Sequence, residues 1–178
     1  NNGENWNEIY NNPDNNNLDL FIFSDSLLFI NTESGLIKYF LDQQTYEPIG
    51  FEESGLKDYY ITSNGTIYGS AFFSIYKSTD FGDSWTTILS DSDVIGSDIL
   101  TNVVYDEYQE KLYAITFDGR IYVTVNDGQN RGIHEELYPF YIEDAAIRPD
   151  GTLYLGTGNA GMFTNTQPLN PPTTISNE

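Results

Sequence analysis

Carboxylates dominate the chemistry that this sequence can offer. Aspartate and glutamate supply 27 of the 178 residues against 7 lysines and arginines, which gives a formal net charge of −20. Several of them lie beside tyrosines in the polar stretches between apolar runs. Such groups could hold calcium, attract a basic partner or present a ring to a sugar, although an ordinary solvated surface has the same composition. The candidate ligand-binding residues are Glu53, Asp58, Asp91, Asp93, Asp98, Tyr138, Tyr141, Glu143 and Asp144.

Other kinds of site lack the residues that they need. His134 is the single histidine and there is no cysteine, so a Ser-His-Asp triad or a histidine or thiolate metal site has almost no material. Asp91 and Asp93 lack the glycine and the distal glutamate of a calcium loop, and no helix follows the glycines of 156–161 as a dinucleotide site requires. We therefore expect no cofactor, with calcium left open. The negative charge argues against nucleic acid as a partner.

A hydroxyl, a carboxylate and an indole come close together in Ser78, Asp80 and Trp85. Their types suggest catalysis, but short polar side chains at this spacing in a tight turn hydrogen-bond to the local backbone. Gly82 supplies the position that needs a positive φ. Strand-like segments flank the turn on both sides. We therefore expect a structural corner between two strands.

Weaker copies of this corner recur along the chain. Gly3 and Trp6 repeat its glycine and tryptophan, and Thr124, Asn126 and Gly128 repeat its hydroxyl, its Asx residue and its glycine. Successive tryptophan positions are 40, 39, 46 and 41 residues apart, counted through Trp6, Tyr46, Trp85, Arg131 and Pro172. Intervals of this length are typical of four-stranded propeller blades.

The pattern Ser/Thr-x-Asp-x-Gly-x-x-Trp resembles the Asp-box of BNR-repeat β-propellers, the superfamily of sialidase, sortilin and photosystem-assembly propellers. The resemblance implies an all-β propeller of four-stranded antiparallel blades, with about four blades in one domain over 1–178. The blades are expected at about 18–49, 55–89, 101–135 and 141–176. An outer strand at 5–10 would either close the ring or complete a preceding blade. We favour part of a larger propeller, and a homo-oligomeric ring is a further alternative.

Propeller connectivity implies a place for each group of candidates. The loops between blades, and those joining second to third strands, share one face that carries the acidic and tyrosine candidates. The Asp-box corners lie on the opposite face. The second strands, such as 66–71 and 112–116, are nearly continuous apolar runs, as expected of strands covered on both sides.

The resemblance to sialidases does not extend to their catalytic residues. That activity would need three converging arginines and an Arg-Ile/Leu-Pro motif, and Arg120, Arg131 and Arg148 do not fit it. Glycosidases need two carboxylates at a defined separation, but with 27 carboxylates any nominated pair would mean little. We expect a non-catalytic binding or scaffold propeller that recognises a glycan or a protein. The alternative is a fragment of an Asp-box glycoside hydrolase whose catalytic residues lie partly outside this chain.

The composition also suggests where the protein works. Asparagine, tyrosine and threonine are abundant and lysine is scarce, which suits an extracellular, cell-surface or periplasmic β-protein. No run approaches the roughly 18 apolar residues of a membrane span.

Overall fold

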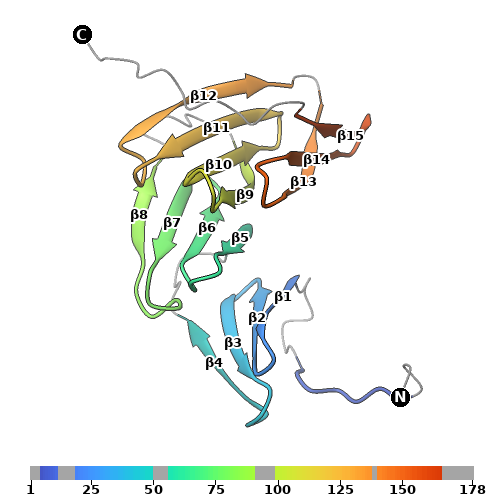
Figure 1. Cartoon of the computed structure of the whole chain (residues 1–178). Helices are drawn as coiled ribbons and strands as arrows, with labels where there is room; N and C mark the ends of the chain where they lie inside the picture. Colours follow the sequence, from blue (N-terminus) through green and yellow to red (C-terminus); the bar gives the residue numbers. More distant parts are fainter. Residues whose placement is uncertain (1–4, 12–18, 50–55, 91–98, 138–139, 166–178) are drawn as a thin grey trace. The chain divides into compact units, whose positions relative to one another are not determined.

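The computed structural model describes residues 5–11, 19–49, 56–90, 99–137 and 140–165, with the backbone alone for 130–136 (Figure 1). The described residues form fifteen strands and no helix. They divide into two compact units, residues 1–56 and 57–178. The prediction of an all-β chain is confirmed for these ranges.

The first unit contains one antiparallel sheet in the order β1-β2-β3-β4. Its strands are β1 (Asp19–Ser24), β2 (Leu27–Thr32), β3 (Gly35–Phe40) and β4 (Thr45–Ile49). The middle strands carry most of the buried side chains, including Phe29 and Tyr39, and Ile49 of β4 is buried as well. The Tyr39 hydroxyl donates to the carbonyl of Ile9 over 2.8 Å, and Tyr10 packs edge-on against Tyr39. Residues 5–11 form no strand, contrary to the expectation for 5–10. The Ile9 carbonyl is bonded by the Tyr39 side chain.

The second unit contains three antiparallel sheets that follow one another along the chain. The first has the order β5-β6-β7-β8: β5 (Asp58–Ile61), β6 (Ile67–Ala71), β7 (Ser74–Ser78) and β8 (Thr86–Leu89). The next consists of β9 (Leu100–Asp106), β10 (Lys111–Thr116), β11 (Arg120–Val125) and β12 (Asn130–Glu136). The described part of the last consists of β13 (Ile142–Ile147), β14 (Leu153–Thr157) and β15 (Gly161–Thr164). The part of the expected blade 141–176 that follows residue 165 lies outside the described residues.

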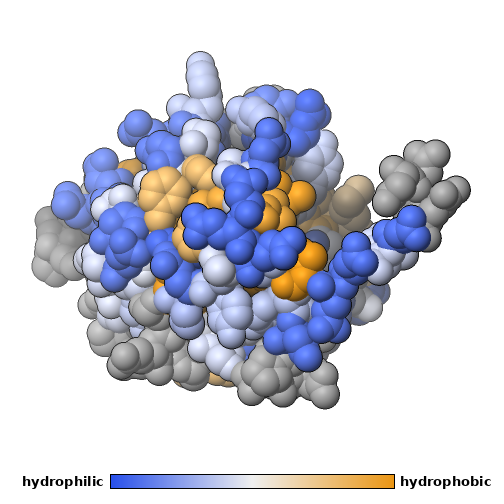
Figure 2. Space-filling model, turned by 90° about the horizontal axis from the view of Figure 1, so that it is seen from below, coloured by the Kyte–Doolittle hydropathy of each residue, from blue (hydrophilic) through white to orange (hydrophobic). Residues whose placement is uncertain are grey.

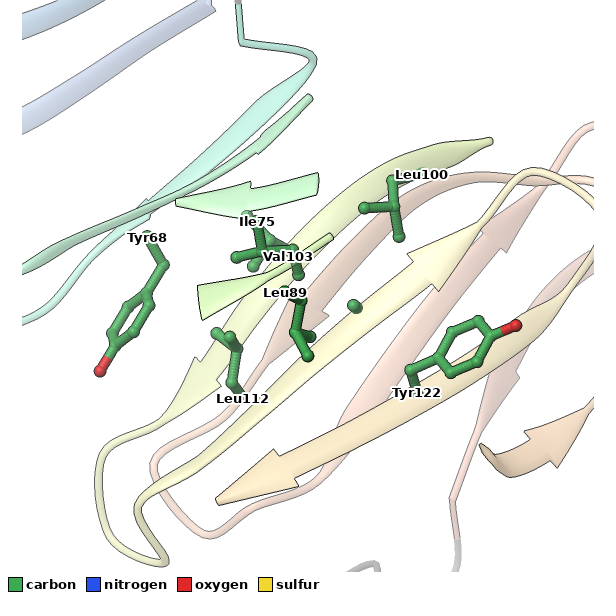
Figure 3. Close-up of a cluster of buried hydrophobic side chains, with 8 residues drawn as sticks. Tyr68, Ile75, Leu89, Leu100, Val103, Leu112 and Tyr122 are labelled. Atoms are coloured by element: carbon green, nitrogen blue, oxygen red, sulfur yellow. The ribbon is translucent and has the colours of Figure 1, made fainter. Parts of the chain in front are cut away.

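The second strand of the middle sheet is buried on both faces. Every residue of β10 is buried, and its side chains alternate between two cores, as the two-residue period of a strand requires. Leu112 and Ala114 belong to a cluster with Ile75 and Leu89 of the preceding sheet, which Figure 3 shows in close-up. Tyr113 and Ile115 belong to the other cluster, with residues of β13 and β14. The apolar second strand is thus covered on both sides, as predicted.

The first strands of the three sheets are neighbours. β9 contacts both β5 and β13, so the sheets share an inner side formed by their first strands (Figure 1). The Asp58 carboxylate of β5 accepts a hydrogen bond of 2.8 Å from the Val103 amide of β9, so a side chain also joins these two strands. Neighbouring first strands with successive four-stranded sheets are the arrangement expected of propeller blades.

On the face of the molecule that Figure 2 shows, hydrophilic side chains predominate among the described residues. Hydrophobic side chains lie among them. Among the described residues there is no helix with the length and apolar character of a membrane span.

Candidate binding site

The corner at Ser78 uses its polar groups locally. The Ser78 hydroxyl accepts from the Gly82 amide over 2.8 Å and donates to Asp80 Oδ1 over 2.8 Å. Ser84 donates its amide to Asp80 Oδ1 and its hydroxyl to Asp80 Oδ2, over 2.9 and 2.6 Å. The Trp85 indole donates to the Gly82 carbonyl over 3.1 Å. The bonds from Ser84, with a further one from Ser78, lower the pKa of Asp80 to about 2, so this carboxylate stays ionised and serves as a hydrogen-bond acceptor.

The copy of this corner at Thr124 connects two neighbouring sheets. Asn126 and Asp127 both have a φ of 53°, and Gly128 a φ of 87°. The Asp127 carboxylate accepts from Lys77 Nζ over 2.7 and 3.0 Å, so the corner of one sheet pairs with a strand of the sheet before it. Gly128 lies directly against the backbone of Ile88. Gly3 and Trp6 belong to a third copy of the corner in the sequence. Gly3 lies outside the described residues, and Trp6 is 88% exposed.

Two cavities flank the Lys77 and Asp127 ion pair. One of about 260 Å³ is lined by both residues and by the stacked rings of Tyr68 and Tyr105, whose centroids are 4.6 Å apart. The other, of about 320 Å³, is lined by Lys77, Asp127 and polar residues of the Ser78 corner and β8. Burial raises the pKa of Tyr68 and of Tyr105, so both hydroxyls stay neutral. Lys77 and Asp127 are paired with each other, and Glu110 is the further charged residue of the first cavity. The ion pair favours a role in joining the sheets.

The acidic and tyrosine candidates fall into three groups. Asp58 is engaged by the backbone of the neighbouring sheet, as described above. Tyr141, Glu143 and Asp144 lie together at the start of β13, all exposed. The remaining candidates, Glu53, Asp91, Asp93, Asp98 and Tyr138, lie outside the described residues.

Tyr141 belongs to a run of exposed apolar side chains that we call the apolar stripe. Its members are Phe72, Phe73, Ile99, Phe117 and Tyr141. They occupy the β6–β7 turn, the residue before β9, the β10–β11 turn and the residue before β13. By the strand order, these positions share one end of the three sheets, which we call the loop face, and the Ser78 corner is at the other end.

Backbone hydrogen bonds join the members of the stripe in series. The Leu100 amide donates to the Phe72 carbonyl over 2.9 Å, and the Phe117 amide donates to the Ile99 carbonyl over 2.8 Å. The Ile142 amide then donates to the Phe117 carbonyl over 3.1 Å. The rings also contact one another, with Phe117 stacked on Tyr141 at 4.9 Å and Lys57 Nζ placed 4.0 Å from the centroid of Phe72. The stripe is therefore held in place before any ligand arrives.

Sequence reasoning named Tyr141 but missed the other four members of the stripe. A signal was present, because Phe72 and Phe73 occupy a two-residue turn and Phe117 precedes an Asp-Gly turn. Such turn positions normally carry polar residues or glycine. No group of three or more histidine, aspartate or glutamate side chains suited to a metal ion occurs in the part of the chain that the structure describes.

No protein-family model and no curated protein matches the sequence. Among solved structures, the chain is similar to the extracellular domain of BT4673 from B. thetaiotaomicron, with a TM-score of 0.64 and 14% identity over 86% of this chain and 21% of that one. It is similar to YCF48 bound to D1 peptide, with a TM-score of 0.63 and 14% identity over 97% of this chain and 60% of that one. For an ancestral GH74 enzyme the TM-score is 0.59, with 12% identity over 79% of this chain and 21% of that one.

These similar proteins are β-propellers, and likeness at such low identity shows the fold alone. The chain therefore has a β-propeller fold, and it spans between 21% and 60% of the length of these matched chains. The same fold thus serves a peptide-bound protein and an enzyme.

Proposed function

We propose that this chain is a non-catalytic binding propeller that recognises a glycan or protein ligand through the loop face of its second unit, outside the cytoplasm. The observation that carries the proposal is the apolar stripe, a set of exposed rings on turns that are hydrogen-bonded to one another. Large apolar side chains exposed side by side are typical of interaction sites. Aromatic residues in particular provide much of the binding free energy at such sites.

The rigidity of the stripe supports this role. Turns that are already ordered lose little conformational entropy when a ligand binds, so more of the contact free energy is available for affinity. Phe117 and Tyr141 are stacked and still 45% and 47% exposed, so each offers a ring surface to a ligand. Sugars and peptides both use such ring surfaces.

The shifted carboxylates do not favour catalysis. Hydrogen bonds lower the pKa of Asp80 and of Asp150, in each case chiefly through a neighbouring hydroxyl, Ser84 and Thr152 respectively. A general acid of a glycosidase needs a raised pKa, which burial or a like charge would provide. These two carboxylates are therefore structural acceptors in turns.

The second candidate function is that of a glycoside hydrolase fragment, and the similarity in fold to an ancestral GH74 enzyme favours it. A panel of neutral and acidic oligosaccharides, together with a peptide array, separates the two functions. Saturable binding without turnover is the expected result. Release of product from any oligosaccharide would refute the non-catalytic role.

A variant pair tests whether the loop face is the site. Replacing both Phe117 and Tyr141 with alanine should weaken binding at least tenfold, since each removed ring is worth about 1 kcal/mol or more. Tyr108→Ala is the matched control, because Tyr108 is an exposed ring on the β9–β10 turn at the other end of the same sheet. Equal affinity of the double variant and the control would contradict the proposal.

A further inference from the structure

The backbones of the stacked residues Phe117 and Tyr141 are held by hydrogen bonds to neighbouring segments. The Phe117 amide donates a hydrogen bond to the Ile99 carbonyl, and the Phe117 carbonyl accepts one from the Ile142 amide. Tyr141 accepts from the Gly158 amide over 3.1 Å and donates its own amide to Asn159 Oδ1 over 3.3 Å. Three separate segments thus position the two rings, and the exposed parts of the rings form a small, rigid platform.

A β-bulge places a carboxylate against the backbone segment that holds Tyr141. The pairing of β13 with β14 shifts between Ile142 and Asp144, which leaves Glu143 as the unpaired residue. Bulges redirect a side chain out of the regular alternation of a strand. Here the Glu143 carboxylate lies over Gly158, so close that a Cβ at that position would overlap it. The Gly158 amide also donates a hydrogen bond to the Tyr141 carbonyl, so Glu143 and Tyr141 both contact the same residue.

The same face already binds a cation on an aromatic ring within the chain. Lys57 Nζ lies 4.0 Å from the centroid of Phe72, at the other end of the stripe. An ammonium or guanidinium group is attracted to the face of an aromatic ring by the quadrupole of the ring, and a neighbouring carboxylate adds to the attraction. Phe117, Tyr141 and Glu143 supply those two elements together.

The charge of the whole chain favours a cationic occupant over a neutral one. A formal net charge of −20 attracts a basic ligand and speeds its association, whereas it contributes nothing to a neutral sugar. The exposed carboxylate of Asp144 follows Glu143 directly along β13.

Resting on the binding function proposed above, we propose that the ligand is a basic polypeptide segment. A lysine or arginine side chain of this segment sits on the platform of Phe117 and Tyr141 and pairs with Glu143.

The test uses the whole chain and an array of synthetic peptides in matched sets. Each set carries arginine, lysine, or the uncharged residues citrulline or glutamine at the same position, and a panel of neutral oligosaccharides is measured alongside. We expect arginine and lysine peptides to bind and their uncharged partners to bind at least several-fold more weakly. Binding should also weaken in about 0.5 M salt, where surface charges are largely screened.

Three variants locate the site. Tyr141→Ala should weaken binding of the basic peptides by about 3-fold to 30-fold, the range of a cation and ring contact. Glu143→Gln should weaken them by a similar factor and reduce the preference for charged over uncharged partners. Tyr108→Ala should leave affinity unchanged, and circular dichroism confirms that each variant is folded.

The outcomes distinguish this inference from the function on which it rests. One outcome is an oligosaccharide whose binding is abolished by Tyr141→Ala but is unaffected by Glu143→Gln and by salt. This outcome would overturn the proposal of a basic peptide ligand and would leave the proposed binding function intact. If neither peptides nor oligosaccharides bind, or if binding is the same in Tyr141→Ala and Tyr108→Ala, both proposals are wrong.

Discussion

Replacing Gly128 with alanine tests the contact between the first two sheets of the second unit. Gly128 has a φ of 87°, and a Cβ there would overlap the carbonyl oxygen of Ile88 and approach Leu89 Cδ2 to 3.3 Å. Ile88 and Leu89 belong to β8, so the overlap cannot be relieved by rotating a side chain alone. The two sheets would have to move apart around the cluster that contains Leu89 and Leu112.

The expected cost has two parts. An alanine at positive φ costs about 1 to 2 kcal/mol. Forcing extra volume into a packed contact costs about 1 to 3 kcal/mol more. Gly161→Ala isolates the first part, because Gly161 has the same φ of 87° and nothing lies within 4 Å of its added Cβ. We therefore expect Gly128→Ala to be about 1 to 3 kcal/mol less stable than Gly161→Ala, which lowers Tm by roughly 2 to 12 °C more.

Tryptophan fluorescence during urea unfolding measures this difference. Trp6 is replaced by phenylalanine in all proteins, so that Trp85, which lies in the same unit as both glycines, is the reporting group. The difference between the two variants gives the cost of the overlap without assuming that the two units unfold together. Equal destabilisation by the two substitutions would refute the packing described here, since backbone strain would then account for the whole effect.

Three further predictions concern single side chains of the two units. Folding lowers the pKa of Asp80 from 3.8 to about 2, so the contribution of this carboxylate to stability is present above about pH 4 and is lost as the pH falls towards 2. Asp80→Asn should remove that part of the acid dependence of stability in urea titrations. An unchanged pH profile of the variant would contradict this prediction. The ion pair of Lys77 with Asp127 is partly exposed, so Lys77→Met should lower the free energy of unfolding by about 0.5 to 1 kcal/mol at low salt and by less at high salt. A loss of stability that does not change with salt would contradict this prediction. The Tyr113 hydroxyl is buried and lacks a hydrogen-bond partner among the described residues, and burial and Asp106 raise its pKa to about 12, so Tyr113→Phe should leave stability unchanged or raise it by up to about 1 kcal/mol. Tyr39→Phe loses the hydrogen bond to Ile9 and should cost about 1 kcal/mol. Thermal unfolding of the two variants measures both effects, and an equal loss of stability in the two would contradict this prediction.

Much of the fold could be predicted because it is encoded locally. The apolar run at 112–116 and the turn at 117–119 define β10 and its hairpin without reference to the rest of the chain. The last strand of the blade expected at 101–135 is present as β12, where pairing with β11 stabilises a segment of weak strand propensity. The expectation failed at residues 5–10, where strand formation depends on a partner that the local sequence does not specify.

The candidate site depended on tertiary structure and was predicted only in part. Asp58 resembled a rim carboxylate in the sequence, but the Val103 amide of the next sheet engages it. In the sequence Glu143 is one acidic residue among many, and only the bulge distinguishes it from its neighbours. Phe72, Ile99 and Phe117 are far apart in the sequence, and hydrogen bonds between three turns bring them into one stripe.

Hydrogen exchange of the chain, free and saturated with the tightest ligand from the peptide and oligosaccharide panels, tests the central claim most directly. A binding propeller that uses its loop face should show slower exchange in the ligand-bound state around 72–73, 99–101, 117–119 and 141–143. Exchange at the turns 79–85 and 107–110, at the other end of the same strands, should not change. Protection confined to those latter turns, or no protection in the second unit, would contradict the account.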